Sequence, residues 1–152
     1  MTVDRRYVAE NHAERVRLQT LVTRLDDAEL ARPMPAGWTV ASILAHLAFW
    51  DQRLLVLLGH CERTGSAALP EAVREADVDW INDAAKPLML ALPPRAAAHL
   101  AVSIADALDG KLEALPDDFL ARNAAAGTPL NLIRAHHRRQ HLDEIERALR
   151  VS

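Results

Sequence analysis

The chain has 152 residues, about the length of one domain, and half of its residues are hydrophobic. Its formal net charge of −3 at pH 7 excludes the strongly basic surface that nucleic-acid-binding domains usually carry. A single cysteine, Cys61, excludes an internal disulfide and is typical of a reducing compartment. The charged N-terminus has no signal-peptide pattern, and no apolar run reaches the roughly 20 residues that cross a membrane. We therefore expect a cytoplasmic protein.

The first half of the chain predicts two long helices. Residues 3–30 carry apolar side chains at steps of three and four, which is the helical period, and the proline-rich residues 33–37 end this pattern. The second helix is expected over residues 39–58, with Thr39 as its N-cap and Gly59 as its stop.

The middle of the chain is interrupted by small and proline residues. Residues 65–77 are small, acidic and irregular, and predict a loop. The segment 77–92 predicts a short helix that Pro87 disturbs. Residues 95–115 carry a clear apolar stripe and predict the third long helix.

The last part of the chain begins with a polar stretch, residues 116–127, and continues into a fourth long helix. Thr128 and Pro129 are an N-cap followed by proline at the first helical position, so this helix is expected to reach about residue 150. Together these elements predict an all-α protein. It is a single four-helix bundle over residues 1–152, with a short extra helix before the third long helix.

Histidines interrupt two of the apolar stripes. In the last helix, His137 and His141 occupy core positions four residues apart, so they lie one above the other. His46 occupies a core position in the second helix, on the stripe that includes Trp50. Each ring can be a neutral core group bonded to a carbonyl or carboxylate, or the three can share a divalent cation. Three imidazoles with an open fourth position are typical of catalytic metal sites.

Other side chains of the second helix are candidates for supporting roles. Trp50, together with Trp38 just before the helix, can shape an apolar pocket or pack in the core. Asp51 lies about 140° from His46 around the helix, so it cannot share a face with that histidine. We expect Asp51 to form a salt link between packed helices.

Three arginines accompany the histidine pair of the last helix. Arg134, Arg138 and Arg139 can receive an anionic substrate at the mouth of a pocket, or they can form a solvated face. For Arg138 we consider one specific role, binding the carboxylate of a thiol cofactor.

Two stretches of the chain resemble the DinB-like (DinB/YfiT) superfamily. Residues 37–54, GWTVASILAHLAFWDQRL, resemble its tryptophan-containing turn and the helix that follows, and residues 137–145, HRRQHLDEI, resemble its final-helix motif. The intervening residues 78–100 resemble the middle segment of many members. The resemblance implies a four-helix bundle, commonly a homodimer, that binds a divalent metal. The ligands that it implies in this chain are His46, His137 and His141, with zinc or nickel as the expected metal.

The resemblance also implies a class of activity. Characterised relatives include metal-dependent transferases that use mycothiol or bacillithiol, and other relatives have been suggested to be hydrolases. We therefore expect a metal-dependent S-transferase or hydrolase acting on a small electrophilic molecule, with Arg138 and Trp50 binding the cofactor. The 152 residues lack the extra C-terminal domain of mycothiol-dependent maleylpyruvate isomerases, so that isomerase activity is not expected.

Two other classes of function are consistent with the same residues. One is a non-catalytic protein that binds or sequesters a small molecule, with a structural metal or none. The other is a structural dimer that has lost its metal. An open coordination position facing a cavity favours catalysis over both alternatives.

One position departs from the motif of the resembling family. Glu144 stands where glutamine is frequent, and it lies near His137 around the helix. It can be a fourth ligand, an orienting group, a general base, or the partner of an arginine. Because ligand imidazoles must be unprotonated, metal affinity is expected to fall below about pH 6.

Overall fold

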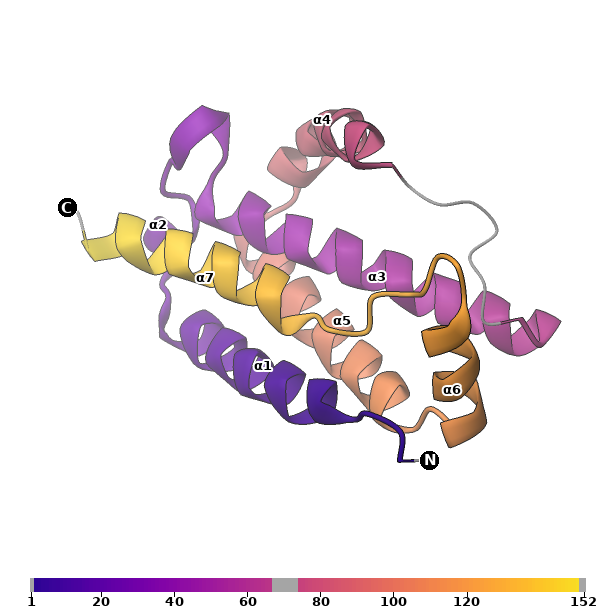
Figure 1. Cartoon of the computed structure of the whole chain (residues 1–152). Coiled ribbons are helices and arrows are strands. Elements are labelled where there is room, and N and C mark those ends of the chain that lie inside the picture. The colour runs from indigo at the N-terminus through magenta and orange to yellow at the C-terminus, as the bar shows by residue number, and fades with distance from the viewer. Residues whose placement is uncertain (1, 67–73, 151–152) are drawn as a thin grey trace.

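The computed structural model describes residues 2–66 and 74–150, and within them it is all-helical, with no strand. Four long helices, α1, α3, α5 and α7, form the bundle, while α4 lies outside against α3 and α6 lies at one end (Figure 1). Each bundle helix packs on two others, so that α1 and α3 both contact α5 and α7. The predicted fold class is confirmed. The helices are α1 (Arg6–Arg24), α2 (Asp27–Leu30), α3 (Val40–Thr64), α4 (Glu75–Ala91), α5 (Pro94–Glu113), α6 (Asp117–Ala125) and α7 (Ala135–Arg150), with a 3₁₀ turn at Pro35–Gly37.

The first predicted helix is divided in two. Residues 3–30 do not form one helix, because Leu25 is extended and Asp26 starts the short helix α2. The Asp26 side chain accepts a hydrogen bond from the backbone N–H of Glu29, and the Glu29 carboxylate accepts one from Asp26. This capping box stabilises a new helix start where apolar periodicity alone predicts continuation.

Helix α3 begins where expected and ends later than expected. Thr39 caps it through a hydrogen bond from the backbone N–H of Ser42, as predicted. Gly59 does not stop the helix, which continues to Thr64 and ends at Gly65 in the left-handed conformation. A glycine inside a helix costs only about 1 kcal/mol relative to alanine, and burial of the neighbouring Leu58 outweighs it.

Helix α3 is also long and apolar enough to cross a membrane by length and composition. Its most apolar 18-residue window has a mean hydropathy of 1.3, but 61% of that window is buried inside the domain. The apolar character of α3 is therefore that of a core helix in this bundle. The cytoplasmic location stays a prediction.

Helix α4 is longer than the sequence predicts, and helix α6 was not predicted. The segment before the third long helix is 17 residues long, and Pro87 lies within it without ending it. Part of the predicted loop 65–77 belongs to this helix, and residues 67–73 lie outside the described residues. The polar stretch 116–127 contains α6, whose Phe119 and Leu120 are buried against the end of the bundle.

Helix α7 starts six residues later than the Thr128-Pro129 signal predicts. Asn11 of α1 supplies the reason, because its Oδ1 accepts hydrogen bonds from the backbone N–H groups of Arg134 (2.7 Å) and Ala135 (3.0 Å). These N–H groups lack partners inside the helix. The cap therefore comes from another helix, and it fixes the point on α1 where α7 begins.

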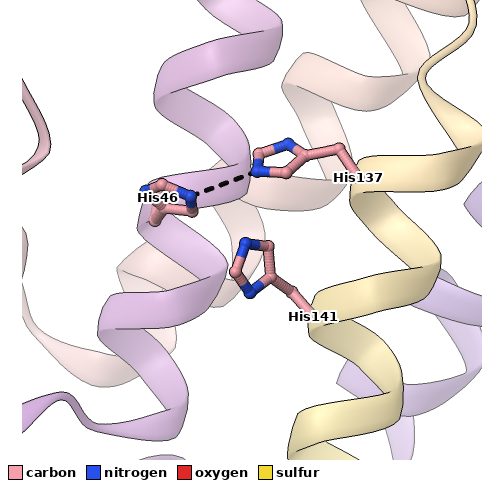
Figure 2. A group of neighbouring side chains, drawn as sticks. All are labelled: His46, His137 and His141. Atoms are coloured by element: carbon pink, nitrogen blue, oxygen red, sulfur yellow. Dashed lines mark hydrogen bonds between the residues drawn. The ribbon is translucent and has the colours of Figure 1, made fainter. Parts of the chain in front are cut away.

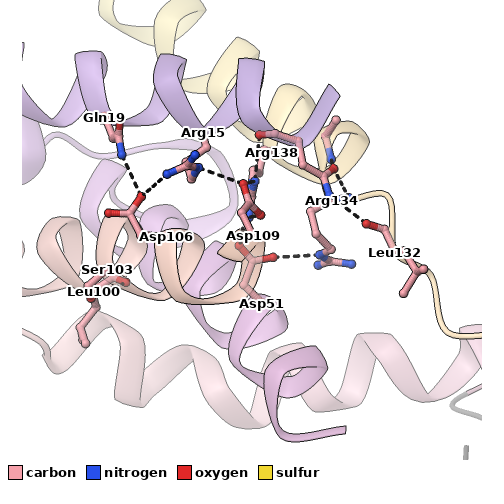
Figure 3. Close-up of polar contacts among 12 residues, drawn as sticks. Arg15, Gln19, Asp51, Leu100, Ser103, Asp106, Asp109, Leu132, Arg134 and Arg138 are labelled. Atoms are coloured by element: carbon pink, nitrogen blue, oxygen red, sulfur yellow. Dashed lines mark hydrogen bonds and ion pairs between the residues drawn. The ribbon is translucent and has the colours of Figure 1, made fainter. Parts of the chain in front are cut away.

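A buried ion network joins α7 to α3 and α5 (Figure 3). The side chain of Arg138 is 1% exposed, and its guanidinium donates to Asp51 of α3 (3.0 Å) and to Asp109 of α5 (2.8 and 2.9 Å). Burial alone would lower the pKa of Arg138, but the bonds to Asp109 and the charge of Asp51 outweigh burial and raise it. The predicted salt link of Asp51 is confirmed, and it also accepts from Arg134.

We predict that Arg138→Met lowers the free energy of unfolding by about 3–5 kcal/mol, because it leaves two buried carboxylates without their main cation. Urea unfolding followed by circular dichroism measures the change. The matched control is Arg139→Met, since Arg139 is 49% exposed and its pair with Glu14 should contribute about 1 kcal/mol or less. Equal losses in the two variants would contradict the structural role given to Arg138.

Candidate metal centre

Three imidazoles from two helices meet between α3 and α7. His46 points from α3 toward His137 and His141, which lie one turn apart on α7 (Figure 2). One nitrogen from each ring lies within 4.8 Å of the others, an arrangement that can hold a metal ion. His46 is buried and the other two are partly buried. The predicted convergence of these three side chains is confirmed.

The distance between ring nitrogens of His46 and His137 shows whether these two residues can bind one cation. Their Nε2 atoms are 3.1 Å apart. Two imidazole nitrogens at about 2.0–2.1 Å from one zinc ion would lie roughly 3–3.5 Å apart, so this pair fits. The Nδ1 atom of His46 is buried without a hydrogen-bond partner, so among the described residues this ring makes its polar contact only through Nε2. Three uncharged nitrogen donors suit zinc, nickel and related ions.

The surroundings keep two of the imidazoles neutral. Burial, and then the nearby His141, lower the pKa of His46 to about 4. Burial, the two other histidines and the positive charges of Arg134 and Arg138 lower the pKa of His137 to about 2. Both rings therefore present lone pairs at pH 7. Proton competition at these two nitrogens begins well below the pH of about 6 expected from the sequence.

Glu144 lies beside the third histidine. Its Oε2 is 2.9 Å from Nδ1 of His141, one turn earlier on α7. A carboxylate there accepts a hydrogen bond from Nδ1–H and leaves Nε2 free for a ligand. This geometry corresponds to the orienting role, one of the four open for Glu144. In the described part of the chain its only ion-pair contact is with His141, so the role as an arginine partner is not observed.

The histidines line a cavity of about 900 Å³ between α3, α4, α7 and the turn before α3. Both tryptophans predicted to shape a pocket lie in its wall. Trp38 meets the ring of His46 edge to face, with centroids 5.7 Å apart. The indole N–H of Trp50 donates to Asn82 of α4 at 2.9 Å, which ties the cavity wall to that helix.

The structure corrects the prediction for Arg138. This side chain does not line the cavity, because it is buried in the ion network with Asp51 and Asp109. Arg138 follows His137 by one residue and so points about 100° away around α7. Arg134, three residues before His137 and on its face, lines the cavity instead. Arg139 pairs with Glu14 outside the cavity.

Sequence reasoning missed several residues of the cavity wall. Asn82 comes from α4, and no local pattern shows that α4 covers this side of α3. Gln140 and Arg147 also line the cavity, from α7. Helical spacing could have predicted both positions. Gln140 lies three residues after His137, and Arg147 lies three residues after Glu144, so each shares a helix face with a predicted site residue.

One comparison with known proteins gives a match. A family model described as the mycothiol maleylpyruvate isomerase N-terminal domain matches residues 12–146, which is most of the chain. This domain is of the DinB/YfiT-like type, so the resemblance drawn from the histidine motifs is confirmed. No curated protein and no solved structure matches.

The pKa values predict that the metal-free protein loses stability as the pH falls from about 6.5 to about 4. An unfolded histidine titrates near pH 6.5, so in this window the unfolded state binds more protons than the fold, and the free energy of unfolding decreases. Urea unfolding at several pH values measures the slope. His137→Leu should reduce it, whereas His136→Leu, at an exposed neighbouring position, should leave it unchanged. An identical slope in all three proteins would contradict the assignment.

Removing the carboxylate beside His141 should weaken metal binding. We expect Glu144→Ala to lower the affinity for zinc by about 10–100-fold, because His141 loses the group that fixes its tautomer and orientation. Competition with a chromophoric chelator measures the affinity. Glu146→Ala is the matched control, since Glu146 pairs with Arg17. Equal zinc affinities for the two variants would contradict the orienting role.

Proposed function

This chain belongs to the mycothiol maleylpyruvate isomerase N-terminal domain family, and from that premise we propose that it is a metal-dependent enzyme acting on a small electrophilic molecule. The reaction that we propose is transfer of a low-molecular-weight thiol of the mycothiol or bacillithiol type, or hydrolysis. One observation carries the proposal: three histidines from α3 and α7 converge on the wall of a cavity that can admit a small molecule.

The three histidines would hold the cation, zinc or nickel, through ring nitrogens. When bound, such an ion supplies Lewis-acid chemistry that lowers the pKa of a water or a thiol. The low pKa values of His46 and His137 mean that no proton has to leave these rings at pH 7. Because the cluster lies in the cavity wall, a small molecule in the cavity can reach it.

Glu144 is the proposed catalytic carboxylate. Its Oε2 holds His141, and the side chain is 37% exposed and lines the cavity. Its other oxygen has no hydrogen-bond partner among the described residues, so it is free to accept a proton from the attacking water or thiol. Trp50 and Trp38 would bind the apolar part of the substrate and exclude water around it.

The test begins with metal content. Protein purified without a histidine tag should contain about one divalent ion per chain by elemental analysis. His46→Ala, His137→Ala and His141→Ala should each lose it, because three ligands are needed for a stable site. His136→Ala, which removes an exposed histidine of the same helix, should keep it. Full metal content in all three ligand variants would overturn the assignment.

Activity then separates the classes of reaction. The protein is assayed with mycothiol, bacillithiol and glutathione against 1-chloro-2,4-dinitrobenzene, and with p-nitrophenyl acetate in the absence of thiol. Metal-dependent formation of a thioether supports S-transfer, and metal-dependent ester cleavage supports hydrolysis. Tight binding of these compounds without turnover would overturn the enzyme proposal in favour of a sequestering protein.

A further inference from the structure

A positively charged side chain, that of Arg134, lies in the cavity wall beside the histidines. Arg134 lines the cavity one helical turn before His137, and its side chain is only 11% exposed. Its Nε donates to Asp51 at 2.8 Å (Figure 3). Its two Nη atoms have no hydrogen-bond partner among the described residues, and they are not sealed from the surface. This edge of the guanidinium is therefore free to bind a ligand.

A second guanidinium lies close to the first. Arg53 of α3 lies over the ring of Trp50, with its Cζ atom 5.7 Å from the ring centroid, and Trp50 lines the cavity. Within the described residues Arg53 makes no ion pair. Burial and the positive charge of Arg134 lower the pKa of Arg53. The two cations therefore repel each other. Arg134 lines the cavity, whereas Arg53 lies over Trp50 and is not itself part of the cavity wall.

The nearby carboxylates are already occupied. Asp51 accepts from both Arg134 and Arg138, and Asp109 is bound by Arg138 on both of its oxygens. Asp109 also pairs with Arg15, whose other partner is Asp106. With Arg15 and Asp106 included, four guanidiniums face three carboxylates, which leaves one positive charge without a partner. An uncompensated charge away from bulk water is costly, and an anion brought by a ligand would remove that cost.

We propose that Arg134, supported by the nearby positive charge of Arg53, binds the carboxylate of the small molecule that enters this cavity. The free Nη edge of Arg134 offers two donors in one plane, which match the two oxygens of a carboxylate. Arg53 adds a second charge from the opposite helix.

The position of the site defines the ligand further. Arg134 is three residues from His137, so the carboxylate would lie about one helical pitch, roughly 5 Å, from the histidine cluster. A ligand that reaches both places has its carboxylate roughly two to four bonds from the group that enters the metal centre. That reactive group rests on the proposed function, whereas carboxylate binding by Arg134 does not need a metal.

The test uses the ¹⁵N-labelled, metal-free full chain at pH 7 in a buffer without chloride. Propionate is the probe and propionamide is its uncharged counterpart. The indole N–H signal of Trp50 reports binding, with the signal of Trp80, which does not line the cavity, as the internal reference. We expect a saturable shift of the Trp50 signal with propionate and none with propionamide. Arg53→Gln and Arg134→Gln should each weaken propionate binding by about tenfold or more.

Two control variants remove the same charge elsewhere on α7. Arg139 pairs with Glu14 outside the cavity, and Arg150, at the C-terminal end of the helix, is exposed and does not line the cavity. Arg139→Gln and Arg150→Gln should both bind propionate as the original protein does. Arg53→Gln is the decisive variant, since Arg53 makes no ion pair in the described part of the chain and its loss should leave the fold intact.

Three results would overturn the proposal: no saturable shift with propionate, equal binding of propionamide, or equal effects of all four substitutions. Zinc titration of the same samples keeps the two proposals separate. Propionate binding without zinc binding would overturn the metal proposal alone. Zinc binding without propionate binding would overturn the carboxylate site alone.

Discussion

The bonds of Arg138 to Asp51 and Asp109 are the interaction on which the candidate site depends. They join α7 to α3 and α5 inside the bundle, where a misplaced charge would be costly. Because Arg138 lies between His137 and His141 in sequence, burying its guanidinium sets the rotation of α7. That rotation turns both histidines toward α3. On α3, Asp51 and His46 lie about 140° apart around the helix axis. One side of α3 therefore binds Arg138, and another side faces the two histidines of α7.

Two polar environments therefore lie side by side between the same helices. One is the network of arginines and aspartates around Arg138, and the other is the histidine cluster. The first is fully charged, with each carboxylate bound by guanidinium groups. The second is kept neutral, because burial and nearby positive charge lower the pKa values of His46 and His137. Arg134 belongs to both, since it binds Asp51 and contributes to the low pKa of His137. The positive charge of Arg134, which adds to burial in lowering the pKa of His137, is also a charge that would attract an anionic ligand.

Local sequence signals located the helices well and their ends less well. The capping residue Thr39 and the extent of α5 lie close to where the sequence predicts, although Leu100 of its predicted apolar stripe is exposed. The errors have tertiary causes. Packing of buried neighbours carries α3 past Gly59, and the side chain of Asn11 caps α7 far from the local Thr128-Pro129 signal. Rules for a single helix cannot predict the continuation of α3 or the cap of α7, because both depend on residues from elsewhere in the chain.

Helical spacing alone predicts the all-helical bundle and the placement of three histidines in its apolar stripes, because an imidazole at a core position is visible in the sequence. The roles of the arginines follow from how the helices pack. Arg138 follows His137 directly, yet its partners are 87 and 29 residues away, and their approach removes it from the cavity. The same packing leaves the Nη edge of Arg134 free. Ion pairing depends on which helices meet and at what rotation, and no spacing within one helix contains that information.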